Sequence, residues 1–213
     1  MSLRIMPDGR IVIRAPYRTP LAEIESFFQS RKDWVRKKLG EMDAAAGKDG
    51  PSTRMFASGE KFLYLGESYP LEIQSKDGRK RPLTLSWSRF ILDEERTDEA
   101  RVLFIEWYRE EAKRLFADRV DHYSKRLNLL AKSIKITSAE SRYGSCSPTN
   151  SLCFTWRLIM APLAVIDYVI IHELVHVKVK NHSKKFWESV ALAMPGYKVH
   201  RSWLRKNNHL LRL

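Results

Sequence analysis

The chain has 213 residues, of which 44% are hydrophobic and 30% are charged, and it carries a formal net charge of +13 with a pI near 9.8. This composition is typical of a folded globular protein and excludes a largely disordered chain. The longest apolar run, residues 158–171, spans 14 positions and contains Pro162 and Asp167, which excludes a transmembrane helix. The N-terminus has no apolar segment of the signal-peptide type, so we expect a cytoplasmic protein with Cys146 and Cys153 as free thiols.

Positive charge is concentrated at the C-terminus, where residues 177–213 contain nine Lys or Arg and one acid, Glu188. Long-range attraction makes nucleic acid, nucleotides and acidic proteins candidate partners of this basic surface. A solvated face that only confers solubility is the alternative.

Residues 1–95 have the pattern of a strand-rich region that also contains helices. Residues 10–16 alternate like a strand, and residues 19–42 predict one or two amphipathic helices with Thr19 as the N-cap. Residues 60–92 then predict three or four short strands. We expect this region to form one domain.

Residues 96–213 are expected to form the second domain. Residues 96–129 hold the longest helical pattern, and residues 133–162 predict three strands with turns near Gly144 and at residues 147–150. Pro162 should start a helix that runs from 163 to about 179, and two further helices follow, at 183–194 and from Lys198 onward.

The helix after Pro162 carries the motif His172-Glu173-x-x-His176. One helical turn separates the two histidines, so both can bind one metal ion, and imidazole favours zinc. Glu173 lies about 100° around the helix, where it can accept a proton from a water held by the metal. The alternative is a pair of core histidines hydrogen-bonded to backbone groups.

A catalytic zinc site needs a third protein ligand, and His182 follows His176 at the spacing of the metzincin pattern. That pattern has a glycine where this chain has Val179, so the chain must turn differently. Asn181 tolerates left-handed dihedral angles, and Ser183 can cap the next helix. Two other histidines compete for the role from a basic C-terminal setting, His200 and His209.

The run SRYGSCSPTNSLCFTWRLIMAPLAVIDYVIIHELVHVKVKNHSKKFW, residues 141–187, resembles the signature of the YgjP-like metal-dependent hydrolases, relatives of the SprT-like and WLM zinc peptidases. FFQSRKDWVRKKL and SGEKFLYLGESYPLEI resemble the family's N-terminal part. The resemblance implies an α+β fold with a minimal zincin-like metallopeptidase domain, built from a small antiparallel sheet and the HExxH helix. It also implies Zn²⁺ held by His172, His176 and His182, with Glu173 as the base.

Two further features bear on how a substrate is held. In zincins a strand edge beside the metal holds the substrate backbone, and residues 150–156 are the expected strand. Arg142 and Tyr143 are candidates to stabilise an oxyanion or to bind an anionic group, although they can equally well only fix the turn and pack the hairpin. Phe186 and Trp187 are expected to be core residues that support the site.

The pattern as a whole predicts a zinc-dependent metallopeptidase that acts on polypeptide substrates. Two alternatives remain open at this point. One is a metal-dependent nucleoside triphosphate hydrolase, favoured by the basic residues but weakened by the lack of a Gly-rich phosphate loop. The other is a nucleic-acid-associated module whose metal is structural, against which Glu173 argues because a closed metal site has no use for a base.

Overall fold

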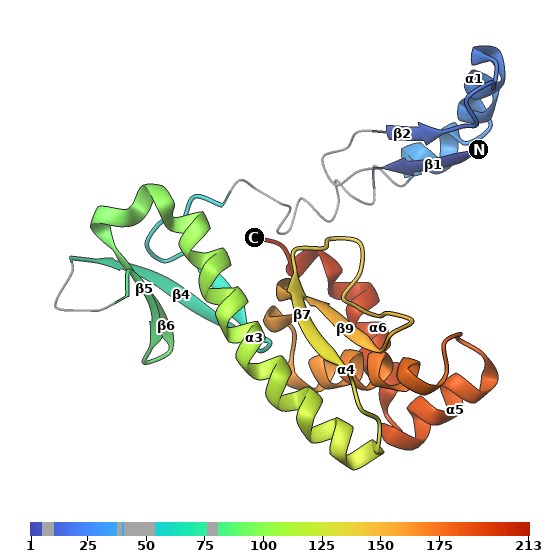
Figure 1. The fold of residues 1–213 in the computed structure, drawn as a ribbon. Helices are drawn as coiled ribbons and strands as arrows, with labels where there is room; N and C mark the ends of the chain where they lie inside the picture. The colour runs from blue at the N-terminus through green and yellow to red at the C-terminus, as the bar shows by residue number, and fades with distance from the viewer. Residues whose placement is uncertain (6–10, 38–39, 41–53, 76–80) are drawn as a thin grey trace. The chain divides into compact units, whose positions relative to one another are not determined.

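The computed structural model describes residues 1–5, 11–37, 40, 54–75 and 81–213. The chain divides into two compact units, Met1–Thr53 and Arg54–Leu213 (Figure 1). This boundary between compact units lies after Thr53, whereas the expected domain boundary lies after residue 95. The strands of residues 61–93 belong to the second unit because they share a hydrophobic core with the long helix that follows them. Whether 1–95 and 96–213 act as separate functional domains stays a prediction.

The first unit consists of a hairpin and helices. Strands β1 (Ser2–Ile5) and β2 (Ile11–Arg14) pair antiparallel, and α1 (Leu21–Gln29) is followed by helical residues 32–37. One or two helices were expected here and two helical segments are found, but Thr19 is not the N-cap. Pro20 takes that position in an extended conformation, so the helix starts one residue later. Part of the expected second helix, at 38–39 and 41–42, lies outside the described residues.

The second unit begins with a four-stranded sheet in the order β3-β4-β6-β5. Its strands are β3 (Lys61–Tyr64), β4 (Glu67–Gln74), β5 (Leu83–Ser86) and β6 (Arg89–Asp93). The short helix η1 (Glu94–Glu99) leads into α3 (Ala100–Leu127), which packs on this sheet through Phe104, whose ring centroid lies 4.1 Å from that of Phe62. Figure 1 shows α3 running from this sheet to the C-terminal helices.

A three-stranded sheet follows, formed by β7 (Ser133–Thr137), β8 (Gly144–Cys146) and β9 (Ser151–Thr155). Its order is β7-β9-β8, with β7 parallel to β9 and β8 antiparallel to it. The prediction of an antiparallel sheet is therefore wrong. The most apolar strand, β9, lies at the centre of this sheet, and its Leu152 and Phe154 side chains are fully buried. The turn expected near Gly144 corresponds to the bends at residues 140–143, and Gly144 itself starts β8.

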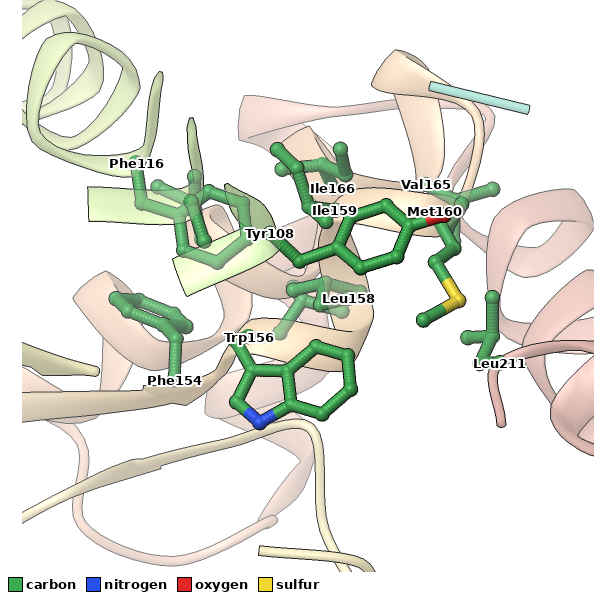
Figure 2. Close-up of a cluster of buried hydrophobic side chains, with 14 of the residues drawn as sticks. Tyr108, Phe116, Phe154, Trp156, Leu158, Ile159, Met160, Val165, Ile166 and Leu211 are labelled. Carbon is green, nitrogen blue, oxygen red and sulfur yellow. The ribbon is translucent and has the colours of Figure 1, made fainter. Parts of the chain in front are cut away.

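A second part of the core, between α3 and the helix that carries the HExxH motif, contains several large buried side chains. The short helix η2 (Trp156–Met160) leads into α4 (Leu163–Lys178), and the Trp156 ring stacks on Tyr108 with centroids 5.9 Å apart (Figure 2). The sequence of α4 is apolar on nearly all sides of the helix, and the helix is accordingly buried on nearly all sides. Asp167 on α4 accepts two hydrogen bonds from the Arg119 guanidinium of α3, at 2.7 and 2.6 Å.

The start of α4 is fixed by the β3–β4 turn. Gly66 has a φ of +88°, and a Cβ at this position would lie 2.8 Å from the Pro162 ring, so only glycine allows this close approach. The Leu65 and Gly66 amides also donate hydrogen bonds to the carbonyls of Ile159 and Met160, at 2.9 and 3.0 Å.

The chain ends with α5 (Lys184–Ala193), α6 (Tyr197–Asn207) and η3 (Asn208–Leu210), close to the predicted positions. Helices α5 and α6 both pack on α4, and Phe186 and Val190 of α5 are fully buried. Among the helices of the described residues, none has the length and apolar character needed to cross a bilayer.

Candidate metal centre

Three histidine side chains converge at the C-terminal end of α4. His172 and His176 come from the last turns of this helix, and His182 comes from the segment between α4 and α5. The Nε2 atom of His182 lies 3.0 Å from that of His172 and 3.2 Å from that of His176. His200 and His209 do not belong to this group.

The spacing of these nitrogens fits one tetrahedral metal ion. Zn–N bonds of about 2.0–2.1 Å place neighbouring ligand nitrogens about 3.3 Å apart, close to the two separations found here. Three neutral imidazoles are also the donor set of known catalytic zinc sites, in which the fourth position is open. The arrangement therefore fits zinc in both distance and chemistry.

The histidines of α4 are held in the neutral form that a metal ligand requires. Burial, followed by the nearby His176 and His182 rings, lowers the pKa of His172 from 6.5 to about 3. Burial also lowers the pKa of His176. The Nδ1 atom of His176 lies 2.9 Å from the carbonyl oxygen of Val179, which assigns the proton to Nδ1 and leaves the Nε2 lone pair free for a metal.

Aromatic side chains of α5 fix the three imidazole rings. The Phe186 ring is fully buried, and its centroid lies 4.4 Å from that of His176 and 4.8 Å from those of His172 and His182. Trp187 is partly buried and stacks on His182 at 5.7 Å. Both residues therefore support the site as expected.

The turn that carries His182 differs from the expected one. Asn181 is not among the described residues with positive φ, so no left-handed residue reverses the chain here. The helix ends in an extended conformation at Val179, and the Asn181 side-chain oxygen then accepts a hydrogen bond from the Ser183 amide at 3.3 Å. Ser183 is the N-cap residue of α5, as expected, although its hydroxyl makes no capping bond.

Glu173 is buried against the edge of the second sheet. Its side chain is 6% exposed, and a Cβ added to Gly144 of β8 would lie 2.7 Å from its Cγ and Oε1 atoms. Burial raises the pKa of Glu173 from 4.5 to about 7, against the opposing effect of the Arg142 charge. The carboxyl group therefore exchanges its proton near neutral pH.

The two candidate anion-binding residues lie in different surroundings. Arg142 is exposed, and its positive charge opposes the rise that burial causes in the pKa of Glu173. Tyr143 is half-buried and packs against the core, and burial raises its pKa against the opposing effect of the Arg212 charge. Its backbone carbonyl accepts a hydrogen bond from the Thr155 amide at 2.9 Å.

The strand edge beside Glu173 belongs to β8 and not to the expected residues 150–156. Strand β9 is paired on both sides, by β7 and β8, so its backbone has no edge to offer. The turn after β8 is tethered by the Lys180 ammonium, which donates hydrogen bonds to Asn150 Oδ1 at 2.6 Å and to the Ser147 carbonyl at 3.2 Å. Cys146 and Cys153 are free thiols.

Comparison with known proteins identifies the family. A family model described as YgjP-like, metallopeptidase domain, matches residues 1–207. The chain belongs to the YgjP-like metallopeptidase family. No curated protein matches this YgjP-like chain.

Two solved structures are similar to part of the YgjP-like chain. One is the metallopeptidase zymogen abylysin of Pyrococcus abyssi, with 21% identity, a TM-score of 0.39, and coverage of 43% of this chain and 93% of that chain. The other is the metallopeptidase zymogen jannalysin of Methanocaldococcus jannaschii, with 24% identity, a TM-score of 0.38, and coverage of 43% and 92%.

Sequence reasoning missed two features of this YgjP-like site. Gly144 contacts Glu173, and the signal was an isolated glycine in a strand pattern, which often marks a close approach. Arg201 of α6 lies with its guanidinium carbon 4.5 Å from the centroid of the Trp187 ring, and its charge acts on His172. No spacing rule connects these positions, because only the packing of α6 brings them together.

Proposed function

We propose that this YgjP-like protein is a zinc metallopeptidase that hydrolyses peptide bonds, with Glu173 as the general base. The observation that supports this is the convergence of three imidazole nitrogens, two of them from the helix that also carries the buried Glu173 carboxyl group. Family membership supports a polypeptide as the substrate.

His172, His176 and His182 would hold the metal through their Nε2 atoms. When bound, zinc supplies a Lewis acid that lowers the pKa of water and polarises the scissile carbonyl. All other steps are assigned to side chains of the protein.

Glu173 would move the proton. A carboxylate oxygen accepts a proton from the attacking water and then donates it to the nitrogen of the departing amine. Efficient transfer in both directions needs a pKa near the operating pH, and burial raises the pKa of Glu173 to about 7. Arg142 is exposed and its charge acts on Glu173, so it is the better of the two candidates to stabilise negative charge on the substrate, while Tyr143 packs against the core.

The test compares wild type with Glu173→Gln and His176→Ala in metal content and peptide hydrolysis. Glu173→Gln should retain the metal and lose most of the turnover, whereas His176→Ala should lose the metal itself. Glu106→Gln, at an exposed position of α3, is the matched control and should change neither property. Undiminished peptide hydrolysis by Glu173→Gln would refute the assignment of the base.

Nucleoside triphosphates are included as substrates in the same assay. Metal-dependent release of phosphate or pyrophosphate without any peptide cleavage would replace the peptidase proposal with the phosphoanhydride alternative.

A further inference from the structure

A basic groove lies beside the metal centre, between α5 and α6. It encloses about 600 Å³, and a second hollow of about 340 Å³ continues along α6 past Arg205. We call these together the α5–α6 groove. The side chains that matter for its chemistry are Lys184, Trp187, Glu188, Tyr197, Lys198 and Arg201.

The groove and the metal centre share an aromatic wall. The Trp187 ring centroid lies 5.7 Å from that of His182 and 5.8 Å from that of His172, while Trp187 also lines the groove. Tyr197 stacks on Trp187 at 5.5 Å. The groove therefore lies on the other side of the Trp187 ring from the three histidines, close enough for one bound polypeptide to contact both.

The groove presents cations without matching anions. Among the described residues, no carboxylate forms an ion pair with Lys198, Arg201 or Arg205. The only acid in the lining is Glu188, which lies 3.8 Å from Lys184 in an exposed pair of little strength. The Arg201 guanidinium carbon lies 4.5 Å from the centroid of the Trp187 ring, whose own centroid lies 5.8 Å from that of His172, so this cation is close to the metal centre.

The aromatic rings do not favour a nucleic acid in this groove. Stacking a nucleobase requires an open aromatic face. The Trp187 ring is already stacked with Tyr197 and His182 and carries the Arg201 guanidinium over it. A carboxylate needs only a cation as its partner, and in the described part of the chain Lys198, Arg201 and Arg205 form no ion pair.

We propose that the α5–α6 groove binds an acidic segment of the polypeptide substrate, with Arg201 and Lys198 pairing with Asp or Glu side chains next to the scissile bond. This inference rests on the proposed peptidase function and adds the class of peptide that the enzyme selects. Arg201 and Lys198 are thus specificity-determining residues.

The binding test uses the Glu173→Gln protein, so that no turnover interferes. A short fluorescent peptide rich in Glu is compared by anisotropy, at low salt, with the same peptide carrying Gln instead. Two exposed ion pairs should make the Glu peptide bind about tenfold tighter, which corresponds to about 1.4 kcal/mol in total for the two pairs. Arg201→Gln and Lys198→Glu should each remove most of this preference, and added salt should weaken it.

Control variants distinguish the loss of positive charge in the groove from a general charge effect and from a loss of folded structure. Lys113→Glu, at an exposed position of α3, makes the same charge change as Lys198→Glu outside the groove and should keep the preference. Lys198 is itself exposed, so Lys198→Glu tests the groove even if Arg201→Gln disturbs the packing on Trp187. Melting curves of all variants verify the fold.

A kinetic test follows with fluorogenic peptides that differ only in the charge of the flanking residues. In the wild-type enzyme kcat/KM should favour the acidic peptide about tenfold, and Lys198→Glu should bring the ratio near one.

Cleavage without charge preference, together with equal binding of the Glu and Gln peptides, overturns the groove proposal and leaves the proposed peptidase function intact. Selective, Arg201-dependent binding without cleavage of any peptide supports the groove and rejects the peptidase. Displacement of the Glu peptide by ATP at far lower concentrations than by the free peptide overturns the peptide assignment in favour of a nucleotide.

Discussion

Replacing Gly144 by alanine tests whether the buried position of Glu173 matters for catalysis. The added Cβ would lie 2.7 Å from Glu173 Cγ and Oε1, whereas ordinary contacts begin near 3.4 Å. Since Glu173 projects from a buried helix and Gly144 belongs to a paired strand, the carboxyl group must withdraw by about 0.7 Å or the strand must shift. A displacement of about 1 Å in a catalytic group costs on the order of 10²-fold in rate. We therefore expect Gly144→Ala to lower kcat by about that factor while all three histidines keep the metal.

The assay measures kcat for a fluorogenic peptide and metal content in the same preparation. Gly40→Ala is the matched control, because a Cβ there meets no atom within 4 Å. In the Glu173→Gln background, the additional Gly144→Ala change should have almost no effect on residual activity, since both act through one carboxyl group. A Gly144→Ala enzyme with wild-type kcat, or one that loses activity only through lost metal, would refute this reasoning.

Three other changes have defined outcomes. His182→Ala should weaken zinc affinity by more than about 10²-fold, because mutating residues that merely support a ligand already costs up to about that factor. Competition with a chelating dye measures the affinity. In the metal-free protein, burial raises the pKa of Glu173 from 4.5 to about 7, so its folded form binds the proton more tightly and stability falls as pH rises through this interval, by up to about 3 kcal/mol. Urea unfolding of metal-free wild type and Glu173→Gln at pH 5 and pH 8 should show this loss in wild type only, and the opposite contribution of His172 at lower pH cancels in the comparison. Asp167→Ala leaves Arg119 without its partner and should lower the free energy of unfolding by about 1–3 kcal/mol, with little effect on the metal, as measured by denaturation and metal analysis.

The α4 helix could be predicted from the sequence because its signals are local. Pro162 fixes the start, the apolar run shows burial, and a spacing of four residues places His172 and His176 on one face. Helix α3 was predictable in the same way from its amphipathic pattern. These features depend only on the geometry of one element.

The strand order of the second sheet could not be predicted, because it depends on which strand the surrounding core buries at the centre and which strand is left at the edge. Strands β7, β8 and β9 are short and follow one another closely, so a simple antiparallel meander satisfies the same pattern. The full burial of Leu152 and Phe154 favours β9 in the centre, and this leaves β8 at the edge beside Glu173. The packing of Arg201 over Trp187 is another contact between distant segments that has no local signal.

The three histidines are held by two different kinds of structure, and this separates metal affinity from fold stability. His172 and His176 lie on a helix that the core fixes, so their geometry is set as soon as the second unit folds. His182 is exposed, and in the described residues it is held by the Phe186 and Trp187 rings and by the Asn181–Ser183 turn. Removing the third imidazole therefore leaves the core contacts of α4 intact. It follows that loss of metal without loss of fold is the expected behaviour of His182 variants, whereas changes at Phe186 should affect both.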